Sequence, residues 1–192
     1  MVPVTVEETS LNIPLDMPRT SCGCQLCSVG CRTMPGSLVP GDLERIEEFT
    51  GNIGNGDFVM ENFRVSDGAK VGVLVGGKLI PVSIPSLVPA QRPDGRCVFL
   101  TDDGKCSIHP VSPFGCSHVD THMDQVEGDR RVQWCVQSQV AGHKRGERYT
   151  QLCILLDEVG LNAPRAAKRR AAFEAEFEAT MQKEQRGETP TH

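Results

Sequence analysis

The apolar positions of this chain follow a helical period in three stretches. In "DLERIEEFT" they recur at Leu43, Ile46 and Phe49, which is the spacing of one helix face. A second amphipathic helix is predicted in "GERYTQLCILLDEVG" (146–160). A C-terminal helix follows from Ala163, where alanine, glutamate, lysine and arginine dominate. We therefore expect short helices that each bury one side against a small core.

Strand signals are concentrated in the middle of the chain. "KVGVLV" and "KLIPVSI" flank Gly76 and Gly77, which predicts a hairpin. A further strand is predicted around "RRVQWCV" (130–136), whereas residues 52–70 carry no clear period and are expected to be irregular. Three prolines restrict the second hairpin strand to an edge or an extended loop, namely Pro81, Pro85 and Pro89.

These elements predict a small, irregular, cysteine-rich α+β domain with short strands, an amphipathic helix and a C-terminal helix. We divide the chain into an extended N-terminal arm (1–20), a cysteine-cluster metal-binding domain (21–160) and a C-terminal helix with its tail (161–192). Aromatic residues make up only 5% of the sequence, so the core is expected to be thin.

Composition narrows the environment and the partners of the chain. The formal net charge is −5, which argues against a nucleic-acid partner. We expect no membrane span, because no stretch of about 18 apolar residues occurs. The N-terminus lacks the basic and apolar regions of a secretory signal, so we expect a cytoplasmic protein.

Nine cysteines are the main chemical signal. In a reducing compartment, clustered thiols indicate metal ligands or redox groups rather than disulfides. Two segments far apart in the chain each offer three thiols. They are Cys24, Cys27 and Cys31 in the first segment and Cys97, Cys106 and Cys116 in the second. One shared metal site, or two neighbouring sites, would join these segments, and metal binding would then contribute folding energy.

The spacing leaves the identity of the metal open between iron–sulfur and zinc. Structural zinc sites usually carry two short C-x2–4-C knuckles, and only Cys24 and Cys27 form one here. Three thiols within eight residues suit an iron–sulfur cluster, of the [4Fe–4S] type, and we favour it over Zn2+. Cys153 lies on an apolar helix face and is expected to be a small buried hydrophobe, while Cys22 is a further candidate ligand.

The order of motifs resembles the YkgJ-type cysteine-cluster family, a zinc- or iron-chelating domain. "CQLCSVGCR" followed by "LVPGDLERI" is similar to its opening block, and "CVFLTDDGKCSIHPVSPFGC" is similar to its second block. The resemblance covers roughly residues 22–136. It implies a metal or iron–sulfur centre with the ligands Cys24, Cys27, Cys31, Cys97, Cys106, Cys116 and Cys135.

The chain departs from that family at three positions. Gly30 stands where the family has a cysteine, His109 where tyrosine is usual, and Ser112 where arginine is usual. Cys22 lies two residues before Cys24 and offers a replacement for the missing thiol.

Histidines supply further candidate ligands. His118 and His122 lie four positions apart. We prefer His118 as a candidate ligand because it is two residues from Cys116. The basic stretch Lys168–Arg170 is expected to be a solvated helix face.

Three functions fit this site. The first is electron transfer, or a redox accessory subunit for an oxidoreductase or larger complex. The second is a zinc-stabilised protein–protein interaction module without redox activity. The third is a metalloenzyme with an open metal position, for which His109 and His118 are candidate exchangeable ligands.

Overall fold

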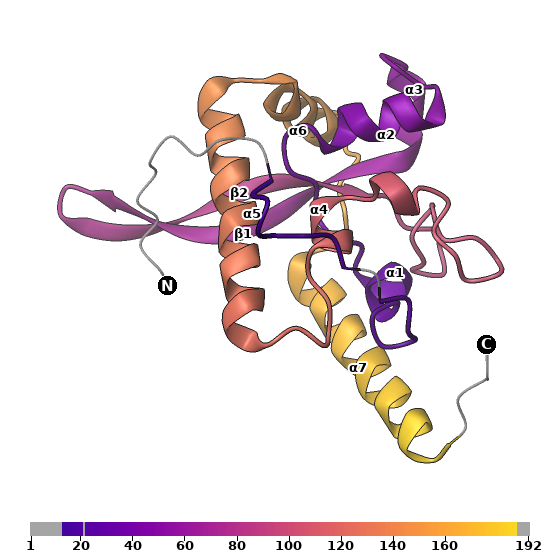
Figure 1. Cartoon of the computed structure of the whole chain (residues 1–192). Helices are drawn as coiled ribbons and strands as arrows, with labels where there is room; N and C mark the ends of the chain where they lie inside the picture. Colours follow the sequence, from indigo (N-terminus) through magenta and orange to yellow (C-terminus); the bar gives the residue numbers. More distant parts are fainter. Residues whose placement is uncertain (1–12, 21, 188–192) are drawn as a thin grey trace.

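In the computed structural model, which describes residues 13–20 and 22–187, seven α-helices and one 3-10 helix accompany a two-stranded antiparallel sheet (Figure 1). The expected α+β class is confirmed. The helices are α1 (Val29–Thr33), α2 (Asp42–Thr50), α3 (Gly56–Asn62), η1 (His109–Val111), α4 (Phe114–Ser117), α5 (Gln125–Arg145), α6 (Arg148–Glu158) and α7 (Ala166–Gln185).

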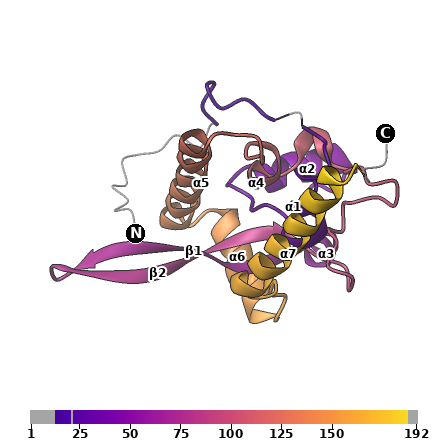
Figure 2. The ribbon, with the colours of Figure 1, turned by 90° about the horizontal axis from the view of Figure 1, so that it is seen from below.

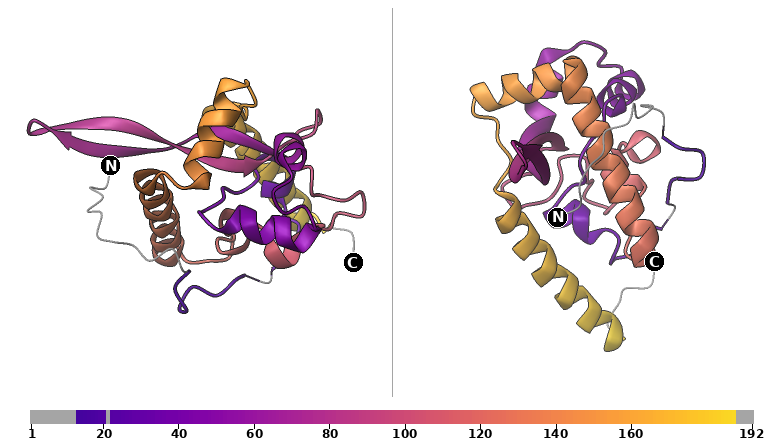
Figure 3. Two further views of the ribbon diagram at one scale, coloured as in Figure 1. Left: turned by 90° about the horizontal axis from the view of Figure 1, so that it is seen from above. Right: turned by 90° about the vertical axis from the view of Figure 1, so that its left-hand side faces the viewer.

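The two strands, β1 (Phe63–Val75) and β2 (Lys78–Pro89), form the predicted hairpin. Gly76 and Gly77 make its turn with positive φ angles of 55° and 77°, which glycine adopts without strain. Gly68 sits at a bulge in β1 with φ +62°, where any Cβ would strike the carbonyl oxygen of Ile84. Figures 2 and 3 show that the far half of the hairpin projects away from the helices.

The core forms two clusters. The larger one surrounds Phe63 at the base of β1 and includes Ile46, Leu87 and Leu156, all fully buried, together with Phe99. The smaller one packs Met17 and Val39 against Phe114, Trp134 and Cys135. Most of the few aromatic residues therefore lie in or against these two clusters.

Helices α2 and α6 confirm the periodicity of the sequence, with one difference each. Phe49 is 50% exposed, and its helix buries Glu47 instead, which pairs with Arg148 at 2.6 Å. On α6 the face that carries Tyr149 and Leu156 is buried, whereas Leu155 and, just after the helix, Val159 are exposed.

Two sequence-based expectations are wrong. Residues 130–136 belong to the 21-residue helix α5 and not to a strand. Residues 52–70 are not irregular, because α3 and the first half of β1 lie within them. Asn55 caps α3 by accepting a hydrogen bond from the N–H of Phe58, a polar signal that apolar periodicity does not register.

A buried carboxylate joins the first half of the chain to α4. Asp42 accepts hydrogen bonds from the N–H of Val39 at 3.0 Å and of Phe114 at 2.8 Å, and pairs with Arg45. Burial raises the pKa of Asp42, against the lowering effect of Arg45 and these N–H groups. Helix α4, which carries Cys116, is thereby fixed against the start of α2.

Of the expected arm, residues 1–12 lie outside the described residues, and 13–20 form no helix or strand. The proposed domain boundaries stay predictions. No helix in the described part of the chain has both the length and the apolar character needed to cross a membrane.

Candidate metal centre

Four potential metal ligands gather at one place, namely Cys22, Cys24, Cys27 and His122. Their ligand atoms all lie within 4.8 Å of one another. Among the described residues this is the one set of three or more Cys, His, Asp or Glu side chains with ligand atoms so close together. We call these four residues the compact group.

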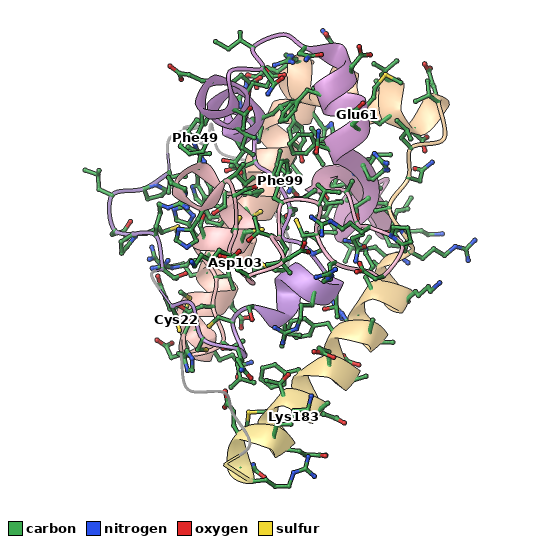
Figure 4. The ribbon with its side chains drawn as sticks, turned by 90° about the vertical axis from the view of Figure 1, so that its right-hand side faces the viewer. Cys22, Phe49, Glu61, Phe99, Asp103 and Lys183 are labelled. Atoms are coloured by element: carbon green, nitrogen blue, oxygen red, sulfur yellow. The ribbon has the colours of Figure 1, made fainter. Side chains whose placement is uncertain are left out.

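The cysteine side of the compact group is a tight turn that leads into α1. The N–H of Ser28 donates to the carbonyl of Cys24 at 3.0 Å, and the N–H of Cys27 points at the Cys24 Sγ at 3.4 Å. Leu26 and Val29 are buried and anchor the turn on both sides of Cys27. Figure 4 shows Cys22 toward the edge of the molecule, away from Phe99 in its middle.

The histidine side comes from the connection between α4 and α5. His122 approaches the Cys24 Sγ to 3.2 Å through its Nε2, and Thr121 places its hydroxyl 3.2 Å from the Cys27 Sγ. Asp120 supports the turn by accepting the N–H of His122 at 2.9 Å. Two consecutive side chains therefore face the cysteine turn.

Arg131 of α5 holds this connection in place. Its guanidinium donates to the carbonyls of Pro18 and His118, at 2.8 and 2.9 Å, and pairs with Glu127 at 2.6 Å. The side chain is only 7% exposed. The segments before Cys22 and before His122 are thus bound to the same residue.

Within the compact group, the thiols of Cys24 and Cys27 differ in pKa. Burial raises the pKa of Cys24, but the N–H of Cys27 and the ring of His122 lower it more, so that it lies at about 7. For Cys27, burial dominates and raises the pKa to about 11, although Thr121 partly offsets it. The hydrogen bond to Cys24 raises the pKa of His122 in turn. A thiolate at Cys24 is the form of cysteine that binds metal ions.

A second set of four cysteines lies deeper in the protein, and we call it the wide group. Its members are Cys31, Cys97, Cys106 and Cys116. Burial raises the pKa of each, and the charges of the other thiols raise the pKa of Cys97 and Cys116 further. The four thiols are therefore within electrostatic range of one another without reaching the spacing of the compact group.

Backbone contacts connect the wide group across the chain. The N–H of Cys97 donates to the carbonyl of Cys31 at 2.7 Å, and an isolated bridge joins Cys106 to Leu100. The N–H of Gly36 points at the Cys116 Sγ at 3.2 Å. The two cysteine segments identified in the sequence thus meet at this point.

The remaining candidates lie elsewhere. Cys135 is buried on α5 with its Sγ near Ser37 and Gln139, and burial raises its pKa to about 12. Cys153 sits in the main core, as expected of a small buried hydrophobe.

His118 is not part of the compact group. Its ring stacks on Phe114, 4.5 Å between centroids, and Ser117 contacts its Nδ1 at 3.0 Å. Burial, with the nearby Arg19, lowers the pKa of His118 to about 4, which keeps the ring neutral. The structure therefore brings His122 to the thiols in place of the preferred His118.

A cavity of about 550 Å³ runs between the two groups and α7. Its lining includes the thiols of Cys27, Cys31, Cys116 and Cys135 together with Arg169 and Phe173 of α7. Both groups of cysteines therefore border the same space.

Comparison with family models, with curated proteins and with solved structures finds no match to this chain. The resemblance to the YkgJ-type family accordingly stays a prediction. What the geometry establishes is a group of three cysteines and one histidine that is compatible with metal binding.

Proposed function

We propose that this chain is a zinc-stabilised interaction module, whose compact group holds one Zn2+ ion. The observation that carries the proposal is the mutual approach of the four ligand atoms to within 4.8 Å. With Zn–S distances of about 2.3 Å, tetrahedral ligands lie roughly 3.8 Å apart, so small side-chain adjustments suffice to fit one ion.

The donor set favours a structural role for this ion. Three thiolates and one imidazole fill all four positions of a tetrahedral site, as in structural zinc sites, whereas catalytic sites keep one position open. The ion would fasten the turn at Cys24 to the segment at His122, 98 positions further along. Metal binding would then add folding energy to a domain whose aromatic core is small. A cytoplasmic location would keep the thiols reduced.

The wide group supports a second candidate function, a redox accessory or electron-transfer protein for an oxidoreductase partner. Each thiolate of a [4Fe–4S] cluster binds a different iron, so the four thiols stand further apart than around a single ion. Cys97 is buried, Cys31 and Cys116 are partly buried, and burial together with the charges of neighbouring thiols raises the pKa of each, although they form no set as close as the compact group. The N–H of Gly36 already points at the Cys116 sulfur, and hydrogen bonds of this kind tune the reduction potential of a cluster.

Metal analysis of protein purified without oxygen tests both candidates. We expect one zinc per chain, which Cys24→Ser and His122→Ala each remove and which the core variant Cys153→Ala retains. If the wide group holds a cluster, iron and sulfide are present as well, and Cys116→Ser removes them without removing zinc. Protein free of zinc, or zinc that persists in both Cys24→Ser and His122→Ala, contradicts the zinc centre.

A further inference from the structure

The projecting half of the β1–β2 hairpin has two edges that differ in their capacity to pair. At its base the edge of β1 is already occupied. The N–H of Val65 donates to the carbonyl of Leu161 at 3.1 Å, and the N–H of Ala163 donates to the carbonyl of Val65 at 2.8 Å. From Ala69 to Val75 this covering segment is no longer present beside β1.

The edge of β2 is closed by proline. The N–H of Leu87 donates to the Tyr149 hydroxyl, and the carbonyl of Leu87 accepts from the N–H of Leu38. The backbone groups of Leu87 therefore point outward, away from β1. Outward positions recur at every second residue, so Pro85 and Pro81 are outward positions as well. Neither has an N–H, and prolines at such positions prevent a further strand from pairing.

The edge of β1 is open over the same length. Directly opposed residues of an antiparallel pair turn their backbone groups in the same sense, either toward or away from each other. The residues opposite Leu79, Pro81 and Ser83 are Leu74, Gly72 and Lys70. The N–H and carbonyl groups of these three β1 residues therefore point outward, and no other segment within the described residues bonds them.

One face of this part of the hairpin carries four apolar side chains and ends at Lys78 beside the turn. Val71, Val73, Ile80 and Val82 share it, because opposed residues lie on the same face. Val73, Ile80 and Val82 are 39%, 44% and 40% exposed. A two-stranded hairpin is marginal in water by itself, so an added strand that covers this face would stabilise it.

The charge of the hairpin selects among the strands that could bind. Between Gly68 and Ser86 the only charged side chains are Lys70 and Lys78, and there is no carboxylate. Lys70 lies on the open edge itself, on the face opposite to Val71. A lysine at an edge discourages neutral apolar strands, whereas an acidic side chain beside it removes that penalty.

We propose that residues 69–75 of β1 bind an extended segment of a partner protein as a third strand of the sheet. In this segment apolar side chains would alternate with acidic ones. The apolar set would extend the Val71–Val73 face, and an acidic side chain would lie beside Lys70. This partner site goes beyond the metal centre and does not depend on it.

Binding of a fluorescent peptide in which valine alternates with glutamate tests the proposal on the full chain. A peptide that alternates valine with lysine is the matched control. We expect saturable binding of the first peptide, and at least tenfold weaker binding of the second. Lys70→Pro, which removes one outward N–H and the charge, should weaken binding at least tenfold. Ser83→Pro, its cross-strand neighbour on the closed edge, should leave binding unchanged.

Lys70→Glu keeps the strand and should reverse the preference between the two peptides. The absence of saturable binding up to about 1 mM peptide would overturn the proposal. An equal loss of peptide affinity in Lys70→Pro and Ser83→Pro would overturn it as well. Sedimentation that shows a dimer of the free chain, dissociated by Lys70→Pro, would assign the edge to a second copy and overturn the acidic partner. Zinc measured in every variant separates these outcomes from failure of the metal centre.

Discussion

The Sγ of Cys24 lies 3.2 Å from the Nε2 of His122, although 98 positions separate the two residues along the chain. This contact closes the loop between the first cysteine turn and the connection that precedes α5. The metal ion would join the same two segments that Arg131 already ties together through backbone carbonyls.

Removal of the metal should unfold one region of the protein and leave the remaining structure folded. A zinc chelator is expected to abolish hydrogen-exchange protection around residues 22–28 and 118–124, because the ion fastens these segments to each other. Helix α6 should stay protected, since Tyr149 and Leu156 pack in the main core. Uniform loss of protection, or none, would show that the ion does not act locally. Cys153→Ala provides the control chain.

Arg131→Ala should lower the free energy of unfolding by about 2–3 kcal/mol, since it removes the charged donor of the Pro18 carbonyl and of the buried His118 carbonyl. The neighbouring Arg130→Ala is the matched control, because Arg130 forms exposed ion pairs with Asp16 and Glu127. Such surface pairs contribute only about 0–1 kcal/mol. Urea unfolding of both variants measures the difference, and equal losses would contradict the role given to Arg131.

The acid sensitivity of Glu127 follows from the same network. Hydrogen bonds from Arg130 and then Arg131 lower the pKa of Glu127 to about 2. The folded state therefore binds fewer protons than the unfolded state, so this carboxylate stabilises the fold above its unfolded pKa. That contribution is lost as the pH falls toward 2. An NMR titration should find the pKa of Glu127 below the ordinary glutamate value, and Arg130→Ala should raise it. An ordinary pKa in the wild type would contradict the network.

Gly36 and Gly30 provide a paired test of the wide group. A Cβ at Gly36 would overlap the backbone of Gly115, next to Cys116, whereas a Cβ at Gly30 meets no atom within 4 Å. Gly36→Ala is expected to cost about 1–3 kcal/mol through overpacking. Gly30→Ala should be neutral or stabilising by up to about 1 kcal/mol, because alanine favours the helix. Thermal unfolding distinguishes them, and similar stability of the two variants would contradict the close packing at Gly36.

The sequence predicts several elements whose buried side is apolar, and it misses α5, whose buried side is partly polar. The hairpin, α2 and α6 follow from alternation or from apolar spacing. Helix α5 buries Ser138 and Gln139 beside Trp134, so its helical period is hidden among polar residues. The signal that could have identified this helix is Asp124, which lies three residues before Glu127. The side chain of Asp124 accepts a hydrogen bond from the N–H of Glu127.

The candidate thiols follow from the sequence, but their division into two groups does not. Cys27 and Cys31 are four positions apart, yet the chain enters α1 between them and turns Cys31 toward Cys97. The spacing of the cysteines along the chain does not indicate that turn. The structure brings His122, rather than the preferred His118, to the compact group for a related reason. Nearness to Cys116 in sequence does not report that His118 stacks on Phe114.

X-ray absorption spectroscopy of the zinc-loaded protein tests the central claim most directly, because it counts the ligand atoms around the ion. A centre formed by Cys22, Cys24, Cys27 and His122 predicts three sulfurs at about 2.3 Å and one nitrogen at about 2.0–2.1 Å. In His122→Ala the nitrogen shell should disappear. Zinc bound by four sulfurs in the wild type, or a nitrogen shell that survives in His122→Ala, would contradict the assignment.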